Sequence, residues 1–314
     1  MSTAEETLRL AEAASSVAER RRPPRLFAGN WWRHAVAVVA IGFAIFPIVY
    51  VVSAAFNADQ SLSASSLIPR RFTLDNFKEI LSGRVTGAGG QSLETPYIRW
   101  YVNSLVIAAT SAVLTVLLGA LAAYAFSRFR FKGRRMGMMT LLLIQMFPQF
   151  LAIVAIYLIL LNTGDVFPVF GLNTATGLIL VYLGGAMGVN AWLMKGFFDT
   201  IPPELDESAR VDGATPAQVF WGVVLPLAAP VLAVVSLISF ITTLNEFLIA
   251  GALLQTQDKQ TLTVGMQFLV DQKYAEEWGP FAAGVLLAAI PVVLLFMSLQ
   301  RFIVQGLTRG AVKG

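Results

Sequence analysis

The sequence of 314 residues contains no cysteine and a single histidine, His34. The missing thiols exclude cysteine catalysis, cysteine-ligated zinc and a disulfide scaffold. One histidine excludes a metal site with several imidazole ligands and disfavours a Ser-His-Asp hydrolase. Charged residues make up only 13% of the chain, compared with about 25% in soluble domains. We therefore expect neither a cysteine- or histidine-based catalytic site nor a metal site built from these residues.

The low content of charged residues reflects long apolar runs that are nearly uncharged. Six runs have the length of a helix, about 20 residues, that crosses the roughly 30 Å hydrocarbon core of a bilayer. They cover residues 35–56, 102–126, 136–161, 175–198, 225–254 and 281–304. Membrane β-barrels are built from shorter, alternating segments. The runs predict an all-α integral membrane protein with six transmembrane helices.

The N-terminal region has two features that admit alternatives. The run 35–56 could be a signal peptide, but its length and the 34 residues before it favour a retained span. Residues 1–34 form an N-terminal tail, in which we expect disorder over 1–30, with a short helix over 4–19 as the alternative.

Lysine and arginine are unequally shared between the two sides of the membrane. With six spans both termini lie on the same side, which holds 16 of the 23 basic residues, whereas the other side holds seven. The positive-inside rule places both termini, including the segments 1–34 and 305–314, in the cytoplasm. The basic residues flank apolar spans, so membrane lipid is their expected partner and nucleic acid is not.

The first external connection, 57–101, is long and contains a glycine-rich stretch at 84–91. Leu81-Ser82-Gly83 and the Gly-Gly-Gln of 89–91 are similar to pieces of the signature of ABC ATPases. The pieces are interrupted and external, and no G-x-x-x-x-G-K-[ST] segment occurs anywhere in the chain. We predict a flexible loop at 84–91.

The cytoplasmic connection 199–226 has the signals of two short helices. The proline pair at 202–203 suits a helix start, and the acidic residues after it lie at the positive end of the helix dipole. Gly213 suits a helix stop. Thr-Pro-Ala-Gln at 215–218 predicts a second helix that opens with a capping box.

The first of these helices has one face with small residues. Positions spaced i, i+3, i+4 and i+7 share this face, and they are Leu205, Ser208, Ala209 and Asp212. The small side chains would allow another protein to approach closely. The residues alone leave a second interpretation equally open, which is an amphipathic helix on the membrane surface.

The same segment carries a family resemblance. Glu207-Ser208-Ala209, Gly213 and the later Leu225-Pro226 resemble the EAA loop of ABC importer permeases, Glu-Ala-Ala-x-x-x-Gly followed by Ile or Leu with Pro. Ser208 replaces the first alanine of that pattern. Other stretches resemble the carbohydrate branch and its MalG-type maltose subunits: 103–104, 123–128, 212–216 and the terminal 300–314.

The resemblance implies a type I ABC importer permease in a bacterial or archaeal plasma membrane, with its core at 102–304. Such a subunit pairs with a second, MalF-like permease subunit. Two ABC ATPase subunits bind ATP and Mg²⁺ and dock underneath, so the resemblance implies that this chain itself is no enzyme and has no catalytic residues, no metal ion and no resident cofactor. An extracytoplasmic sugar-binding protein delivers the substrate. Maltose or maltodextrin is the expected cargo, with trehalose or another oligosaccharide as the alternative.

The resemblance also implies two contacts with the ATPases. The EAA helix would transmit ATP-driven motion through Glu204, Glu207, Ser208, Ala209, Arg210, Asp212 and Gly213. The C-terminal tail would reach the ATPases through Gly306, Arg309, Gly310 and Lys313. A frayed chain end is the alternative for the tail.

Polar residues within the spans form a second candidate site. A carboxylate in a span costs roughly 2.5–3.5 kcal/mol on insertion scales, so it should face a cavity or a partner. We expect a hydrophilic sugar pathway lined by Gln145, Gln149, Asn190, Ser239, Thr243 and Glu246. Polar contacts between helices are the equally weighted alternative. Pro148 and Pro291 should kink their helices.

Other function classes fit the sequence less well. A secondary transporter would need ion-coupling charges in the spans and an inverted repeat, neither of which is evident. A membrane enzyme would need paired acid–base groups. A permease for an anionic solute would need a basic cluster in the outer halves of the spans, so a neutral sugar is preferred.

Overall fold

The computed structural model describes residues 31–58, 68–69, 71–86, 92–270 and 278–311, with side chains as far as Ile303. The chain forms two compact units, Met1–Val51 and Val52–Gly314. Residues 1–30 of the expected N-terminal tail lie outside the described residues.

Within this part of the chain, five helices are long and apolar enough to cross a membrane. They are α2 (Trp31–Ala55), α4 (Tyr97–Arg128), the stretch Gln149–Val166, α7 (Ala175–Phe198) and α14 (Trp278–Ala311). A sixth span results if the bent pair Pro216–Leu227 and α11 (Ala229–Leu244) counts as one. The predicted all-α membrane architecture is therefore confirmed.

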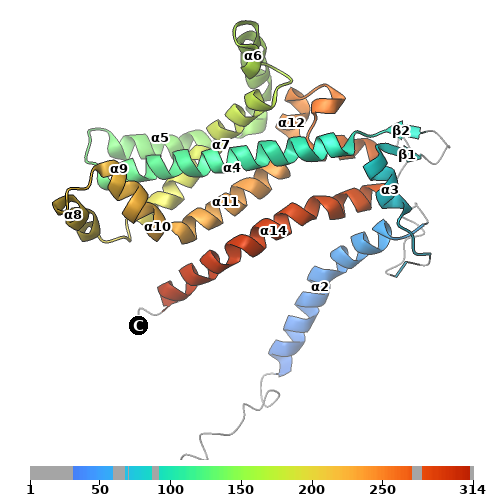
Figure 1. The fold of residues 1–314 in the computed structure, drawn as a ribbon, viewed down its shortest axis with the longest axis horizontal. Helices are drawn as coiled ribbons and strands as arrows, with labels where there is room; N and C mark the ends of the chain where they lie inside the picture. Colours follow the sequence, from blue (N-terminus) through green and yellow to red (C-terminus); the bar gives the residue numbers. More distant parts are fainter. Residues whose placement is uncertain (1–30, 59–67, 70, 87–91, 271–277, 312–314) are drawn as a thin grey trace, which may run out of the picture. The chain divides into compact units, whose positions relative to one another are not determined.

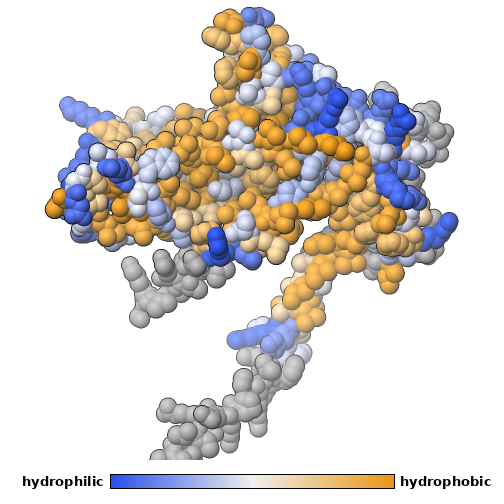
Figure 2. All heavy atoms as spheres, in the orientation of Figure 1, coloured by the Kyte–Doolittle hydropathy of each residue, from blue (hydrophilic) through white to orange (hydrophobic). Residues whose placement is uncertain are grey.

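Helix α4 is the central element of the second unit. It packs along α7 and against α11, and α11 packs against α14 (Figure 1). Ala120 and Ala123 of α4 are fully buried, and a Cβ on Gly119 would lie 3.6 Å from Met194 of α7. Small residues allow helices to pack closely in lipid, where the hydrophobic effect does not drive association. Apolar side chains cover much of the outer surface of these helices (Figure 2).

The third predicted span, 136–161, is broken and not merely kinked. It consists of α5 (Arg134–Met146), the 3-10 turn η2 (Gln149–Ala152) and α6 (Ile153–Val166). A residue before proline is driven into extended backbone, and Phe147, before Pro148, has φ −74° and ψ 124°. Helices α5 and α6 consequently run in different directions (Figure 1), and the expectation of a single helix was wrong.

The fifth predicted span, 225–254, is broken at both ends. The chain passes through α9 (Pro216–Val219), the π-helical η4 (Phe220–Val224) and α10 (Leu225–Leu227) before it bends by 78° into α11. Pro230, in the first turn of α11, has no N–H for the carbonyl of Pro226, which favours the bend. Helix α11 ends at Leu244, and α12 (Leu248–Leu253) begins after three intervening residues. The uninterrupted span that we expected is therefore wrong here too.

The external connection is more ordered than expected at its start. Helix α3 (Asp75–Ser82) ends at Gly83, whose φ is +77°, and β1 (Arg84–Thr86) pairs antiparallel with β2 (Ser92–Glu94). The predicted flexible loop is wrong for 84–86, and 87–91 lie outside the described residues. The remaining short elements are η3 (Pro168–Phe170), α8 (Pro203–Val211), η5 (Gln257–Lys259), α13 (Leu262–Met266) and η6 (Gln267–Leu269).

Candidate functional site

A polar pocket of about 210 Å³ lies among α4, α5, α7 and α11. All six residues expected to line a pathway meet in it, namely Gln145, Gln149, Asn190, Ser239, Thr243 and Glu246. Thr115, Tyr182 and Thr242 add three further hydroxyl groups. The fold thus brings together polar side chains from four predicted spans, and whether they line a pathway stays a prediction.

Gln145 fastens α5 to α7. Its Nε2 donates to the carbonyl of Gly185 at 2.5 Å, and its Oε1 accepts from the backbone N–H of Val189 at 3.2 Å. The close approach depends on glycine, because a Cβ on Gly188 would lie 2.6 Å from the carbonyl oxygen of Leu141. The role of Gln145 is therefore to hold two helices together at the pocket wall.

Glu246 is satisfied by groups on two elements. One oxygen accepts from the N–H of Ile249 at 2.8 Å, and the other from the N–H of Ala250 at 2.8 Å and the hydroxyl of Tyr182 at 2.7 Å. The amides belong to the first turn of α12, where N–H groups have no partner within the helix. The carboxylate therefore caps α12 while it lines the pocket.

Three pocket side chains keep unused hydrogen-bonding groups. Asn190 and Ser239 bond to each other at 3.3 Å between α7 and α11. By contrast, Gln149, Thr242 and Thr243 have no side-chain partner within the part of the chain that the structure describes. Neutral amides and hydroxyls of this kind can both donate to and accept from the hydroxyl groups of an uncharged solute.

Tyr182 is a pocket residue that the sequence reasoning missed. It lies on the face of α7 that carries Asn190, because residues four and eight positions apart lie close together on a helix. This spacing is the signal that would have identified it.

The connection 199–226 contains the two predicted short helices. Helix α8 has the residue pair Pro202 and Pro203 at its start, and Gly213 follows its end with φ +86°. Thr215 and Gln218 form the predicted capping box of α9. The predicted helix boundaries and caps are therefore confirmed.

Most of the residues expected to couple to a partner point outward. Glu204, Glu207, Ser208, Arg210, Asp212 and Gly213 are exposed, as is Leu205 of the small-residue face. Val211, the last residue of α8, is 88% exposed and adds an apolar side chain to this outward surface. Ala209 differs because it is half-buried and packs inward against the core cluster that includes Val219 and Phe220.

A buried ion pair that the sequence reasoning missed holds α8 on the core. Nε of Arg128, the last residue of α4, lies 2.8 Å from Oδ2 of Asp206, and the two side chains are only 9% and 4% exposed. Nη2 of Arg128 also donates to the carbonyl of Ile201 at 3.0 Å. No sequence signal links the partners, since they are 78 positions apart and both read as ordinary polar residues of cytoplasmic connections.

Asp199 forms a second link between the same elements. It accepts hydrogen bonds from Lys195 and from the hydroxyl of Ser127, the latter at 2.7 Å. Burial alone would raise the pKa of Asp199, but the bonds from Lys195 and Ser127 and the Lys195 charge outweigh it, and the pKa is lowered. The ends of α4 and α7 and the start of the 199–226 connection are thereby tied together.

The expected tail contact is only partly described. Gly306, Arg309 and Gly310 lie in α14, which extends to Ala311, so the helix continues into the expected tail. Lys313 lies outside the described residues. Elsewhere, the described residues contain no group of three or more acidic or histidine side chains that could hold a metal ion.

Comparison with protein families matches residues 115–309 to the binding-protein-dependent transport system inner membrane component. The maltose/maltodextrin permease protein MalG of Vibrio parahaemolyticus is 41% identical over 90% of this chain and 96% of the relative. MalG of Escherichia coli K12 is 40% identical over 90% and 95%. GanQ of Bacillus subtilis, a galactooligosaccharides permease protein, is 40% identical over 86% and 90%.

Two solved structures share the fold. A chain of a bacterial ABC transporter involved in the import of alginate matches with a TM-score of 0.68 and 22% identity, covering 89% of this chain and 99% of that one. A chain of a bacterial alginate transporter in complex with a pentasaccharide-bound periplasmic protein matches with a TM-score of 0.61 and 18% identity, covering 86% and 93%. These matches support the arrangement of helices described above.

Proposed function

Since the chain belongs to the binding-protein-dependent transport system inner membrane components, a family of transport permeases and not of enzymes, we propose that it is the permease subunit of an ATP-driven oligosaccharide importer. Maltose or maltodextrin is the preferred cargo, and trehalose or another oligosaccharide is the alternative. The observation that carries the proposal is the polar pocket, in which uncharged amide and hydroxyl groups are left free among membrane-spanning helices.

The chemistry of the pocket favours a neutral, hydroxyl-rich solute. No lysine or arginine lines it, and its one carboxylate, Glu246, is already engaged by Tyr182 and by two backbone amides. An anionic cargo would find no counter-charge there. Gln149, Thr242 and Thr243 would exchange water for sugar hydroxyls at small net cost, as a transit site requires.

The partners follow from the same proposal. A second permease subunit would complete the pathway, an extracytoplasmic binding protein would deliver the sugar, and two ATPase subunits would dock from the cytoplasm. The outward-pointing residues of α8, with Glu207 and Val211 among them, supply the charged and apolar contacts for one ATPase. Both termini lie in the cytoplasm in this arrangement.

The path of coupling would be mechanical. An ATPase that moves α8 also moves Arg128 of α4 through the buried ion pair with Asp206. The unbroken course from α9 through η4 and α10 leads from the same loop to the 78° bend before α11, whose Ser239 and Thr243 line the pocket. Both routes end at helices that form the pocket walls.

The test is purification of the tagged full chain from its native membrane in mild detergent, followed by mass spectrometry and reconstitution into liposomes. We expect a second permease and an ATPase to co-purify. Uptake of radiolabelled maltotriose should require ATP inside and binding protein outside. Uptake of a sugar panel then ranks maltodextrins against trehalose and galactooligosaccharides.

A matched pair of variants links uptake to the pocket. Thr243→Val removes a free hydroxyl at nearly constant shape and should lower uptake, whereas Ser298→Ala, in α14 away from the pocket, should not. Purification of the chain alone, even after cross-linking in intact membranes, would contradict the importer assignment.

A further inference from the structure

A second pocket, separate from the polar pocket, has a volume of about 930 Å³. It lies where the loop 129–133 leads from α4 into α5, against the last turns of α7. Its lining divides into two chemical parts. Arg134, Arg135 and Lys195 supply three positive charges, and apart from Gly133 the other lining residues are apolar, with no acidic residue among them.

The three positively charged side chains of the pocket have few negatively charged partners. Lys195 pairs with Asp199, whose carboxylate also interacts with the charge of Arg134, and Nη2 of Arg134 donates to the carbonyl of Ser127 at 3.4 Å. Arg135 has neither an ion pair nor a hydrogen bond to any residue that the structure describes. The three positive charges of the pocket therefore have one carboxylate, Asp199, within reach, and the guanidinium of Arg135 is left without compensation.

The backbone adds to this positive potential. Arg134 and Arg135 form the first turn of α5, which follows Gly133 with φ +85° and has no side-chain cap and no acidic residue. The N-terminus of a helix carries a partial positive charge, so two arginines there repel it, and an anion at this place is favoured.

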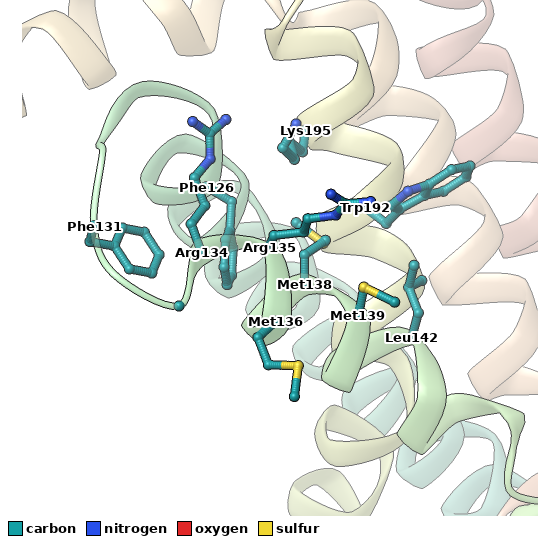
Figure 3. A pocket seen from close by; sticks show the side chains of 11 residues that line it. Phe126, Phe131, Arg134, Arg135, Met136, Met138, Met139, Leu142, Trp192 and Lys195 are labelled. Atoms are coloured by element: carbon teal, nitrogen blue, oxygen red, sulfur yellow. The ribbon is translucent and has the colours of Figure 1, made fainter.

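The apolar part has the character of a trough for a hydrocarbon chain. Figure 3 shows the charged ends of Arg134 and Lys195 toward one end of the pocket and Met136, Met139 and Leu142 toward the other. Methionine side chains are flexible and adapt to irregular apolar partners. The trough continues along α5 into strongly exposed apolar residues, Leu143, Ile144 and Met146. A free phosphate ion has no apolar part that could cover this surface.

The position in the membrane agrees with a lipid. Trp192 lines the pocket and is half-exposed, as is common for tryptophan at the level of lipid headgroups. The charge bias of the connections places this end of α5 at the cytoplasmic face, whose leaflet is rich in anionic lipid.

We propose that this pocket binds an anionic phospholipid of the cytoplasmic leaflet. Arg134 and Lys195 lie at the headgroup phosphate, Arg135 adds positive charge toward Trp192, and one acyl chain lies along Met136, Met139 and Trp192. The site goes beyond sugar transport, and lipid binding is measured separately from uptake.

The test uses the full chain, purified in mild detergent and loaded with phosphatidylglycerol, and native mass spectrometry to count bound lipid. The variant is Arg134→Gln with Arg135→Gln. The matched control is Arg130→Gln with Lys132→Gln, which removes the same charge from the adjacent loop without touching the pocket. We expect about a 30-fold weaker affinity for the variant, corresponding to about 1 kcal/mol for each lost charge, and wild-type affinity for the control.

Two further arms separate the possible ligands. Met136→Gln with Met139→Gln should weaken binding of phosphatidylglycerol with 16-carbon chains but not of its six-carbon analogue. Inorganic phosphate at 50-fold excess should not displace the long-chain lipid. Equal losses in variant and control, an unchanged affinity in the variant, or displacement by phosphate would overturn the proposal. Size-exclusion chromatography of each variant shows that it remains folded, and sugar uptake by the wild type tests the transport function independently.

Discussion

The ion pair between Arg128 and Asp206 offers the sharpest test of how α8 is held. We consider Asp206→Asn, which keeps the shape of the side chain and removes its charge. The Arg128 guanidinium is 9% exposed and would then lie buried without a counter-charge. Removing one partner of a buried pair typically costs about 3–5 kcal/mol. The carbonyl of Ile201 still accepts from Nη2, so we expect the lower end, about 3 kcal/mol.

This cost should appear as local opening of α8. Hydrogen exchange of the amides in 203–211, measured by mass spectrometry on the full chain, should become about 150-fold faster, since 1.4 kcal/mol corresponds to a factor of ten. The matched control is Glu207→Gln, an exposed neighbour in the same helix, whose exchange should stay within about twofold of wild type.

A double variant separates the cost of an orphaned charge from the net value of the pair. Arg128→Met with Asp206→Leu leaves no charge in the site, and replacement of buried ion pairs by apolar residues is often close to neutral. Its exchange should return to within about tenfold of wild type. If Asp206→Asn exchanges no faster than Glu207→Gln, the ion pair does not hold α8 and the reasoning fails.

Three further predictions follow from individual residues. Gly213→Pro should abolish sugar uptake but leave membrane insertion intact, because φ is +86° and the N–H donates to the carbonyl of Arg210 at 3.0 Å; normal uptake at equal expression would contradict this. Glu246→Gln should lower the free energy of unfolding by about 1–3 kcal/mol, since an amide cannot satisfy all three donors, as measured by thermal unfolding beside the milder Tyr182→Phe. The lowered pKa of Asp199 means that its stabilising contribution is complete above its ordinary value of 3.8 and is lost as the pH falls through the lower folded value. Asp199→Asn should therefore reduce the loss of thermal stability between about pH 5 and pH 3, and an unchanged loss would refute the assignment.

The sequence predicted best where local chemistry alone decides the structure. Span 175–198 coincides with α7, and the caps at Thr215 and Gly213 lie where they were expected. In each case the signal lies within a few residues of the feature. By contrast, a run of apolar residues indicates only that a segment is shielded from water. It did not reveal that Pro148 and the polar residues after Leu244 end helices inside such runs.

The candidate sites show the same division. The six pocket residues could be named because polar side chains in an apolar run are conspicuous one by one. Their assembly depends on how α5, α7 and α11 pack, and this packing cannot be predicted from any single segment. For that reason the pairing of Arg128 with Asp206 could not be predicted from the sequence. The same holds for the strand pairing of Arg84 with Glu94 across a glycine-rich tip.

The π-helical segment η4 affects how the direction of α8 depends on the number of residues between α8 and α11. Each residue turns an α-helix by about 100°, and the wider turn of η4 accommodates one residue more than an α-helix of the same rise. Deleting one residue from Phe220–Val224 would restore regular α-helix and leave α9, with its capped end at Thr215, facing nearly as before. Deleting one residue from the helical turns on either side of η4 would instead swing α9 by about 100° around the axis. The face of α8 would then point in a different direction, although no residue of α8 itself had changed. Relatives of this chain should accordingly tolerate the loss of one residue within η4 more readily than the loss of one residue from α9 or α10.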